Sequence, residues 1–193
     1  MAQRHVVFEI EKDYSPLLLV DTGKGKKNAL LDDLIEDLSN NAEVYVLSPK
    51  EIHGRAHKIS SLSVHFLDKL SSPLENVVVF LDEQSQKEKT LEIVKKLSND
   101  KTRVLLLVPY RVFDSFMDLY METRNMENVV VVFLGDIFGA FSDTPLSKNI
   151  QNAFSSRKII LSGNELTPIF PISKEDFLKG VRYILFGVKK SYL

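Results

Sequence analysis

Short apolar runs of strand length recur along the whole chain and constrain its fold more than any other feature. Most of these runs are continuous rather than alternating, and they are rich in Val, Leu and Ile. Strands buried on both faces have this composition, and such strands belong to parallel sheets covered by helices. The runs are Val6–Ile10, which we expect at a sheet edge, and Leu17–Val20, Val44–Leu47, Val77–Leu81, Val104–Val108, Val129–Leu134 and Ile159–Leu161.

The segments between the runs carry apolar residues at helical spacing. Asn28–Leu38 places five aliphatic residues on one stripe and acids on the opposite face. Ser173 is an expected N-cap, because acidic residues follow it in the first turn of the next predicted helix. The other predicted helices are Lys87–Leu97, Val112–Arg124, Pro145–Phe154 and Ser173–Phe186.

Alternation of strand and helix predicts an α/β fold, a doubly wound Rossmann-type and mostly parallel sheet with helices on both faces. We expect residues 1–193 to form a single domain, or a domain with a small C-terminal lobe that begins near Asp143.

The composition excludes several classes of protein. Lys and Arg number 25 against 26 Asp and Glu, so the net charge of −1 gives no field that would hold the molecule on nucleic acid. The chain has no cysteine, which excludes a disulfide framework and a thiolate zinc site and fits a cytoplasmic protein. No apolar run approaches the ~20 residues of a membrane span, so we expect no transmembrane segment.

A glycine-containing turn follows the first buried strand and is the candidate cofactor site. Gly23, Lys24, Gly25, Lys26 and Asn28 stand where a dinucleotide-binding turn would approach a pyrophosphate at a helix N-terminus. The pattern is incomplete, because Asn28 replaces the third glycine. No acid ends the next strand either, where Ser48-Pro49-Lys50 stands instead. The alternative interpretation is an ordinary strand–helix turn with solvated lysines.

A few other polar residues have two interpretations each. Asp21 and Asp82-Glu83 follow buried strands, where they would either bind magnesium or a nucleotide or complement a helix dipole. His53 and His57 have the i, i+4 spacing of metal ligands, but Gly54 favours a loop without metal. Lys189-Lys190 is interpreted as a frayed basic tail, with a juxtamembrane segment as the alternative.

The second half of the chain contains several segments whose order is informative. They are Thr90–Lys96, Val129–Gly139, Ser147–Phe154, Lys158–Asn164 and Pro171–Val181. Their order resembles that of the strands, turns and helices of the extended short-chain dehydrogenase/reductase family, in particular its NAD-dependent nucleotide-sugar epimerases and dehydratases, and the similarity covers roughly Leu17 to Gly187. The resemblance implies a Rossmann fold, NAD(P) as cofactor and, through the helices Lys87–Leu97 and Val112–Arg124, a homodimer.

The chain lacks the residues that the family uses for chemistry. Its Tyr-x-x-x-Lys motif is absent, and the nearest imitation is Tyr120 with Arg124 close to a helix end. Pro109 stands near the place of the catalytic serine, and Phe133 and Asp136 replace the Arg and Asn of Arg-x-x-Asn. We therefore assign no catalytic residues.

These departures predict a pseudoenzyme: a catalytically degenerate epimerase/dehydratase-like domain that serves as an interaction, assembly or regulatory module, with a protein partner or through self-association. One alternative is a sensor that still binds NAD(P) or another nucleotide through Gly23, Gly25 and the lysines. The second alternative is an active epimerase or dehydratase whose site is rearranged around Tyr110 or Tyr120.

Overall fold

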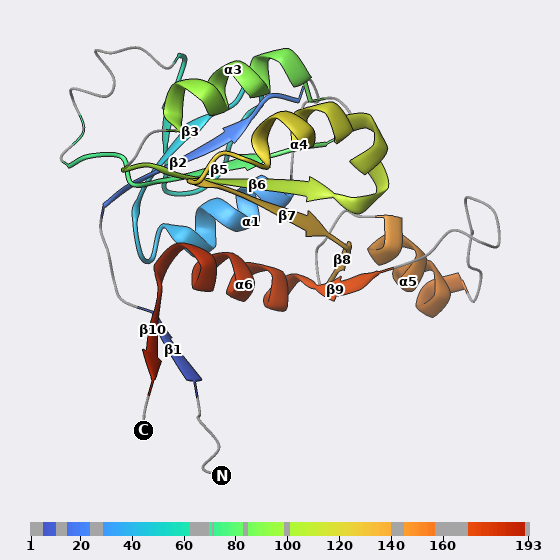
Figure 1. Ribbon diagram of the computed structural model, residues 1–193. Helices are drawn as coiled ribbons and strands as arrows, with labels where there is room; N and C mark the ends of the chain where they lie inside the picture. The colour runs from blue at the N-terminus through green and yellow to red at the C-terminus, as the bar shows by residue number, and fades with distance from the viewer. Residues whose placement is uncertain are drawn as a thin grey trace, which may run out of the picture.

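The computed structural model (Figure 1) describes residues 6–10, 15–23, 29–61, 70, 72–82, 85–98, 101–139, 145–156 and 170–191. Its centre is a six-stranded, all-parallel sheet in the order β4-β3-β2-β5-β6-β7. This is the strand order of the Rossmann fold, which confirms the predicted fold class. The strands are β2 (Pro16–Asp21), β3 (Glu43–Leu47), β4 (His57–Ile59), β5 (Asn76–Phe80), β6 (Arg103–Pro109) and β7 (Val129–Leu134).

Continuous apolar sequence in the inner strands is explained by burial on both faces. In β2, Leu17 and Leu19 point into one hydrophobic cluster, whereas Leu18 and Val20 point into the other, and all four are at most 1% exposed. β5 is likewise buried along its whole length. Successive side chains of a strand alternate between faces, so a strand with helices on both sides has no exposed row of side chains and is apolar along most of its length.

Helices cover the two faces of the sheet in two layers. α1 (Ala29–Leu38) and α6 (Lys174–Phe186) pack on one face, and α3 (Lys87–Leu97), η1 (Tyr110–Phe116) and α4 (Met117–Thr123) pack on the other (Figure 1). Ser173 is the N-cap of α6, as predicted, and its Oγ accepts a hydrogen bond from the Asp176 amide at 3.0 Å. α5 (Pro145–Ser156) lies beyond the sheet, beside β8.

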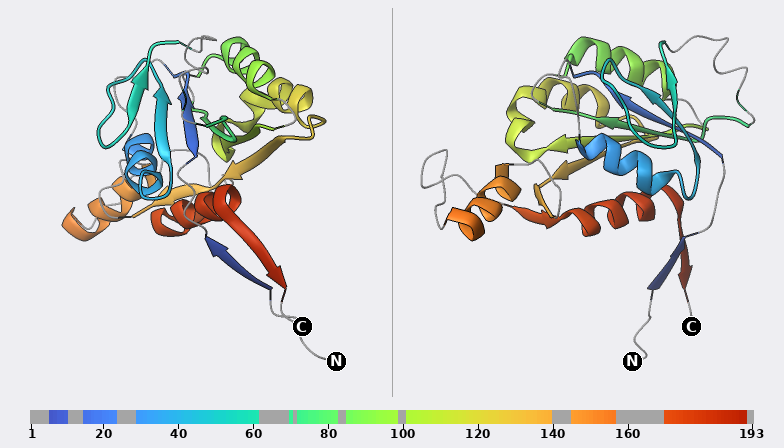
Figure 2. Two further views of the ribbon diagram at one scale, coloured as in Figure 1. Left: turned by 90° about the vertical axis from the view of Figure 1, so that its left-hand side faces the viewer. Right: turned by 180° about the vertical axis from the view of Figure 1, so that it is seen from behind.

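Two small sheets lie outside the central one. β8 (Asp136–Phe138) pairs in parallel with β9 (Pro171–Ser173), and β1 (Val6–Ile10) pairs antiparallel with β10 (Gly187–Ser191). Both views in Figure 2 show the β1–β10 ribbon projecting away from the body of the molecule. The strand predicted at Val6–Ile10 is confirmed, but it belongs to this ribbon and not to the edge of the central sheet. The expectation of a frayed tail at Lys189-Lys190 is wrong, because these residues pair with β1.

The predicted helix at Val112–Arg124 is two elements in the structure. It begins as the 3-10 helix η1 directly after Pro109 and becomes the α-helix α4 at Met117. The tighter first part places Val112 and Phe116, both buried, against the sheet. The predicted strand Ile159–Leu161 lies outside the described residues. Among the helices that the structure describes, none is long and apolar enough to cross a membrane.

An ion pair whose carboxyl is partly buried joins the two helices of one layer. Asp37 of α1 lies 3.4 Å from Arg182 of α6, but Asp37 Oδ2 and Arg182 Nε are buried without a hydrogen-bond partner among the described residues. Burial raises the pKa of the Asp37 carboxyl, and the charge of Arg182 offsets this only in part. A raised folded-state pKa means that the ionised carboxylate destabilises the fold above that pKa.

We therefore expect Asp37→Asn to raise the free energy of unfolding at pH 7, by up to about 1 kcal/mol. The gain should disappear at acid pH, where the wild-type carboxyl is also neutral. Urea denaturation at pH 7 and near pH 3.5 measures both values. A loss of stability at pH 7 would show that the pair with Arg182 outweighs the burial of the charge.

Candidate functional site

The strand order reverses between β2 and β5, so the carboxyl ends of these two strands form the topological switch point of the sheet. From β2 the chain crosses to β3 through α1, and from neighbouring β5 it crosses to β6 through α3. α1 and α3 pack into different hydrophobic clusters on opposite faces, so the two connections diverge just after the ends of β2 and β5. In open α/β sheets, ligands bind at this topological switch point.

A buried ion cluster occupies the switch point. Lys50, which follows β3, extends across the end of β2, and its Nζ lies 2.9 Å from Asp21 Oδ2 and 2.9 Å from Asp82 Oδ2. The side chains of Lys50 and Asp21 are 1% and 0% exposed, and that of Asp82 is 29% exposed. One ammonium thus joins the carboxyl ends of three strands.

Hydrogen bonds from the surrounding loops hold the three charged groups in place. Gly23 N donates to Asp21 Oδ1 at 2.8 Å, and Ser85 Oγ donates to Asp82 Oδ1 at 3.1 Å. The amide of Lys50 donates to Ser48 Oγ at 3.1 Å. Each partner is fixed from its own loop, so the cluster is a preorganised network rather than a chance contact.

The cluster keeps Lys50 charged and has a net negative charge. Burial alone would lower the pKa of Lys50, but hydrogen bonds to the carboxylates of Asp82 and Asp21 raise it more, to above its ordinary value of 10.5. One ammonium and two carboxylates sum to −1 when all three are ionised. Such a group favours a cation over an anionic phosphate.

Gly23, the first glycine of the candidate turn, makes room for this cluster. A Cβ at Gly23 would lie 2.6 Å from Asp82 Oδ2 and 2.8 Å from Lys50 Nζ. The adjacent Thr22 is also buried, and its hydroxyl lies 2.8 Å from that of Thr90 on α3. The space that a glycine leaves free beside the backbone is thus filled by charged side chains of the protein itself.

The other residues of the predicted cofactor site, Lys24, Gly25, Lys26 and Asn28, lie outside the described residues, and their role stays a prediction. The sequence placed Asp21 and Asp82 correctly at the carboxyl edge, but it did not pair either of them with Lys50. The one sequence signal for this contact was that Lys50, Asp21 and Asp82 stand at the carboxyl ends of neighbouring buried strands.

The two candidate metal histidines do not share a helix. His53 lies in the loop after β3, whereas His57 begins β4, with its ring 5.1 Å from that of Tyr45. His57 Nε2 lies 3.7 Å from Glu43 Oε1. Within the described ranges, no group of three or more His, Asp or Glu side chains is arranged to hold a metal ion.

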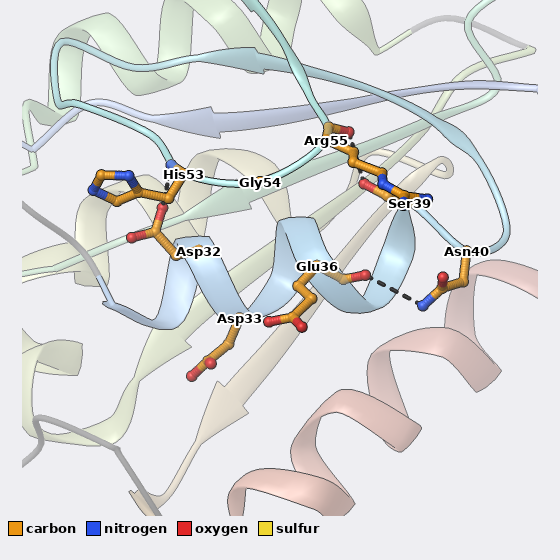
Figure 3. Close-up of a pocket in the computed structure, with 8 residues that line it drawn as sticks. All are labelled: Asp32, Asp33, Glu36, Ser39, Asn40, His53, Gly54 and Arg55. Atoms are coloured by element: carbon orange, nitrogen blue, oxygen red, sulfur yellow. Dashed lines mark hydrogen bonds between the residues drawn. The ribbon is translucent and has the colours of Figure 1, made fainter.

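A hollow with a volume of about 460 Å³ lies between α1 and the loop after β3 (Figure 3). Some of its polar groups contact one another: His53 N donates to Asp32 Oδ1 at 2.9 Å, and Ser39 Oγ donates to the Arg55 carbonyl at 2.8 Å. Asp33 pairs with Lys174 of α6 at 3.1 Å. The lining residues are Asp32, Asp33, Glu36, Ser39, Asn40, His53, Gly54 and Arg55.

Tyr120, Tyr110 and Asp136, which the sequence singled out, make packing and ionic contacts. Tyr120 packs edge-to-face with Phe133, with ring centroids 5.7 Å apart. Tyr110 packs similarly on Phe170 at 4.7 Å. Asp136 forms an ion pair with Arg111 and accepts a hydrogen bond from the Phe170 amide at 3.3 Å.

No family model, curated protein or solved structure is significantly similar to this chain. The ion cluster at the switch point is therefore the feature from which function must be argued.

Proposed function

We propose that this chain is a Rossmann-type domain that does not use its dinucleotide crevice and acts as an interaction, assembly or regulatory module. The observation that carries the proposal is the bridge from Lys50 Nζ to Asp21 and Asp82 at the switch point. The resemblance to extended short-chain dehydrogenases/reductases without Tyr-x-x-x-Lys supports the same conclusion from the sequence. In a protein of this kind, the fold serves to present a surface that binds other molecules and does not serve to hold a cofactor.

The energetics of the cluster support the absence of dinucleotide binding. A pyrophosphate over the Gly23 turn would approach the Asp82 carboxylate, which lies 2.6 Å from the position of a Cβ at residue 23. Withdrawing Lys50 to meet the phosphate would break its buried ion pair with Asp21, at a cost of about 3–5 kcal/mol. Micromolar binding is worth about 8 kcal/mol in total, so this cost removes a large part of it.

Calorimetric titration with NAD⁺, NADH, NADPH, ATP and a UDP-sugar tests the proposal. We expect no saturable heat for any of them, which corresponds to dissociation constants above about 1 mM. A dinucleotide-binding Rossmann protein titrated in the same buffer is the positive control. Micromolar binding of a dinucleotide would instead establish the nucleotide-sensor alternative, and turnover of a nucleotide sugar would establish the enzyme.

A further inference from the structure

The hollow between α1 and the loop after β3, which we call the α1 hollow, has charges of both signs in its lining (Figure 3). The carboxylates of Asp32, Asp33 and Glu36 lie toward the start of α1, whereas the Arg55 side chain extends toward the end of this helix. Its volume of about 460 Å³ is in the range of sites for small molecules. None of its lining residues belongs to the ion cluster at the switch point, so the hollow is a separate candidate site.

Two hydrogen bonds hold the loop against α1 and fix the shape of the hollow. His53 N donates to Asp32 Oδ1 at 2.9 Å near the start of the helix, and Ser39 Oγ donates to the Arg55 carbonyl at 2.8 Å near its end. Between these contacts, Gly54 has a φ of +103°, a backbone conformation that favours glycine and lets the loop lie close to the helix. Both walls of the hollow are therefore formed before any ligand arrives, which reduces the cost of binding.

The charges in the lining are not all neutralised by the protein itself. Within the described part of the chain, the Glu36 carboxylate and the Arg55 guanidinium have no hydrogen-bond or ion-pair partner, and both residues are exposed. Asp32 accepts a hydrogen bond from a backbone amide but has no cation beside it among the described residues. Asp33 differs, because Lys174 Nζ lies 3.1 Å from its Oδ1. The two remaining carboxylates and one guanidinium sum to −1.

We infer that the α1 hollow binds a small diamino acid, a molecule with one carboxylate and two ammonium groups, such as free lysine. The net charge of this ligand is +1 and matches the −1 of the lining. Its carboxylate pairs with Arg55, because a planar guanidinium can donate two parallel hydrogen bonds to a carboxylate. Its ammonium groups, each with three donors, contact the carboxylates of Glu36 and Asp32.

The spacing of these groups along α1 suits a ligand with charges at both ends. Asp32 and Glu36 are four residues apart, so their side chains are neighbours on one face of the helix. The Arg55 carbonyl is held at Ser39, so the guanidinium lies beyond Glu36 toward the end of the helix. Residues 32 to 39 span about 10 Å at 1.5 Å per residue. This length accommodates a chain of four methylene groups between two charged ends.

Calorimetric titration with L-lysine, cadaverine and L-glutamate at pH 7 tests the inference, at low ionic strength because salt screens exposed charges. Cadaverine is lysine without its carboxylate, so its net charge is +2. We expect lysine to bind with a dissociation constant below about 1 mM, and cadaverine to bind at least tenfold more weakly because it has no group for Arg55. Glutamate, with a net charge of −1, should give no saturable heat.

This comparison separates a site from a merely acidic surface. An acidic surface attracts the ligand with the larger positive charge, so it would bind cadaverine at least as tightly as lysine. That result would overturn the inference, and so would the absence of saturable lysine binding.

Substitutions at the two exposed residues test the assignment of the charged groups. Glu36→Gln should raise the dissociation constant for lysine at least tenfold, and Arg55→Gln should abolish the preference for lysine over cadaverine. Glu92→Gln is the matched control, because Glu92 is an exposed residue of α3, which packs on the opposite face of the sheet. The control should leave lysine binding unchanged. Lysine binding that neither Glu36→Gln nor Arg55→Gln alters would overturn the inference, because the ligand would then bind elsewhere.

The inference goes beyond the proposed function and does not depend on it, because the α1 hollow and the ion cluster share no residue. Failure of lysine to bind leaves the proposed function standing, since that function is tested by titration with nucleotides. Dinucleotide binding by a chain that also binds lysine would overturn the proposed function alone.

Discussion

Lys50→Met is expected to lower the free energy of unfolding by about 3–5 kcal/mol, as measured by urea denaturation at pH 7. Methionine matches the length of the lysine stem, so the change removes the charge and leaves most of the packing. The buried carboxylate of Asp21, with a side chain that is 0% exposed, and that of Asp82 then lose the ammonium that contacts both of them. Two carboxylates in one site repel each other.

Two further variants test whether the lost stability comes from the buried charges of this cluster rather than from the removal of an ion pair in general. Lys95→Met removes an exposed pair with Glu122, in which the side chains are 52% and 49% exposed, and should cost less than about 1 kcal/mol. Adding Asp21→Asn and Asp82→Asn to Lys50→Met should restore at least half of the lost stability, because it removes the uncompensated charges. A loss that persists in this triple variant would mean that packing of the Lys50 stem, rather than charge, holds the strands together.

The same cluster should also make the free energy of unfolding fall at alkaline pH. The pKa of Lys50 is raised in the folded protein, so its contribution is complete below the ordinary value of 10.5 and declines as pH rises through the folded-state pKa. The difference in stability between wild type and Lys50→Met should therefore shrink above about pH 10.5.

Gly135→Ala is the second substitution from which we expect a large loss, of about 2–3 kcal/mol in the free energy of unfolding. A Cβ at Gly135 would lie 2.0 Å from the carbonyl oxygen of Phe170, which is backbone and has no rotamer to change. The Asp136 amide donates to this same oxygen at 2.6 Å and begins the pairing of β8 with β9. The methyl group therefore separates the two strands where their pairing starts.

Urea denaturation gives the overall effect of Gly135→Ala, and exchange of the Asp136 amide with deuterium reports the local one. Gly180→Ala is the matched control, because Gly180 lies within α6 and a Cβ there would have nothing within 4 Å. This control should gain about 0.5–1 kcal/mol from the higher helix propensity of alanine. Unchanged protection of Asp136 in Gly135→Ala would show that the segment at Phe170 moves aside at little cost.

The sequence predicted the buried strands well because strands covered on both faces leave a local signature. The runs beginning at Leu17, Val77 and Val104 all correspond to inner strands of the sheet. The three-residue strands β4, β8 and β9 were missed, since each is too short for a period to be recognised. β10 was missed because two adjacent lysines, Lys189 and Lys190, are untypical of a strand. Its partner β1 also lies at the other end of the sequence, so no local pattern indicates the pairing.

The candidate site was only partly predictable, for a physical reason that differs from that of the strands. A carboxylate directly after a buried strand must lie at the carboxyl edge, so Asp21 and Asp82 could be placed from local sequence. The direction of a long, flexible lysine side chain is set by tertiary packing instead. The sequence therefore indicated only that no acid directly follows β3, and it did not indicate that Lys50 contacts both Asp21 and Asp82.

The β1–β10 ribbon brings the first and the last described strands side by side, so the same sheets could form in a chain whose segments are joined in a different order. Val6 and Ser191 are register partners at one end of this ribbon, and their strands lie outside the central sheet (Figure 2). A bridge of a few residues between such partners would close the backbone into a ring, which could be reopened at an exposed turn such as Arg124–Asn125 without altering any sheet pairing.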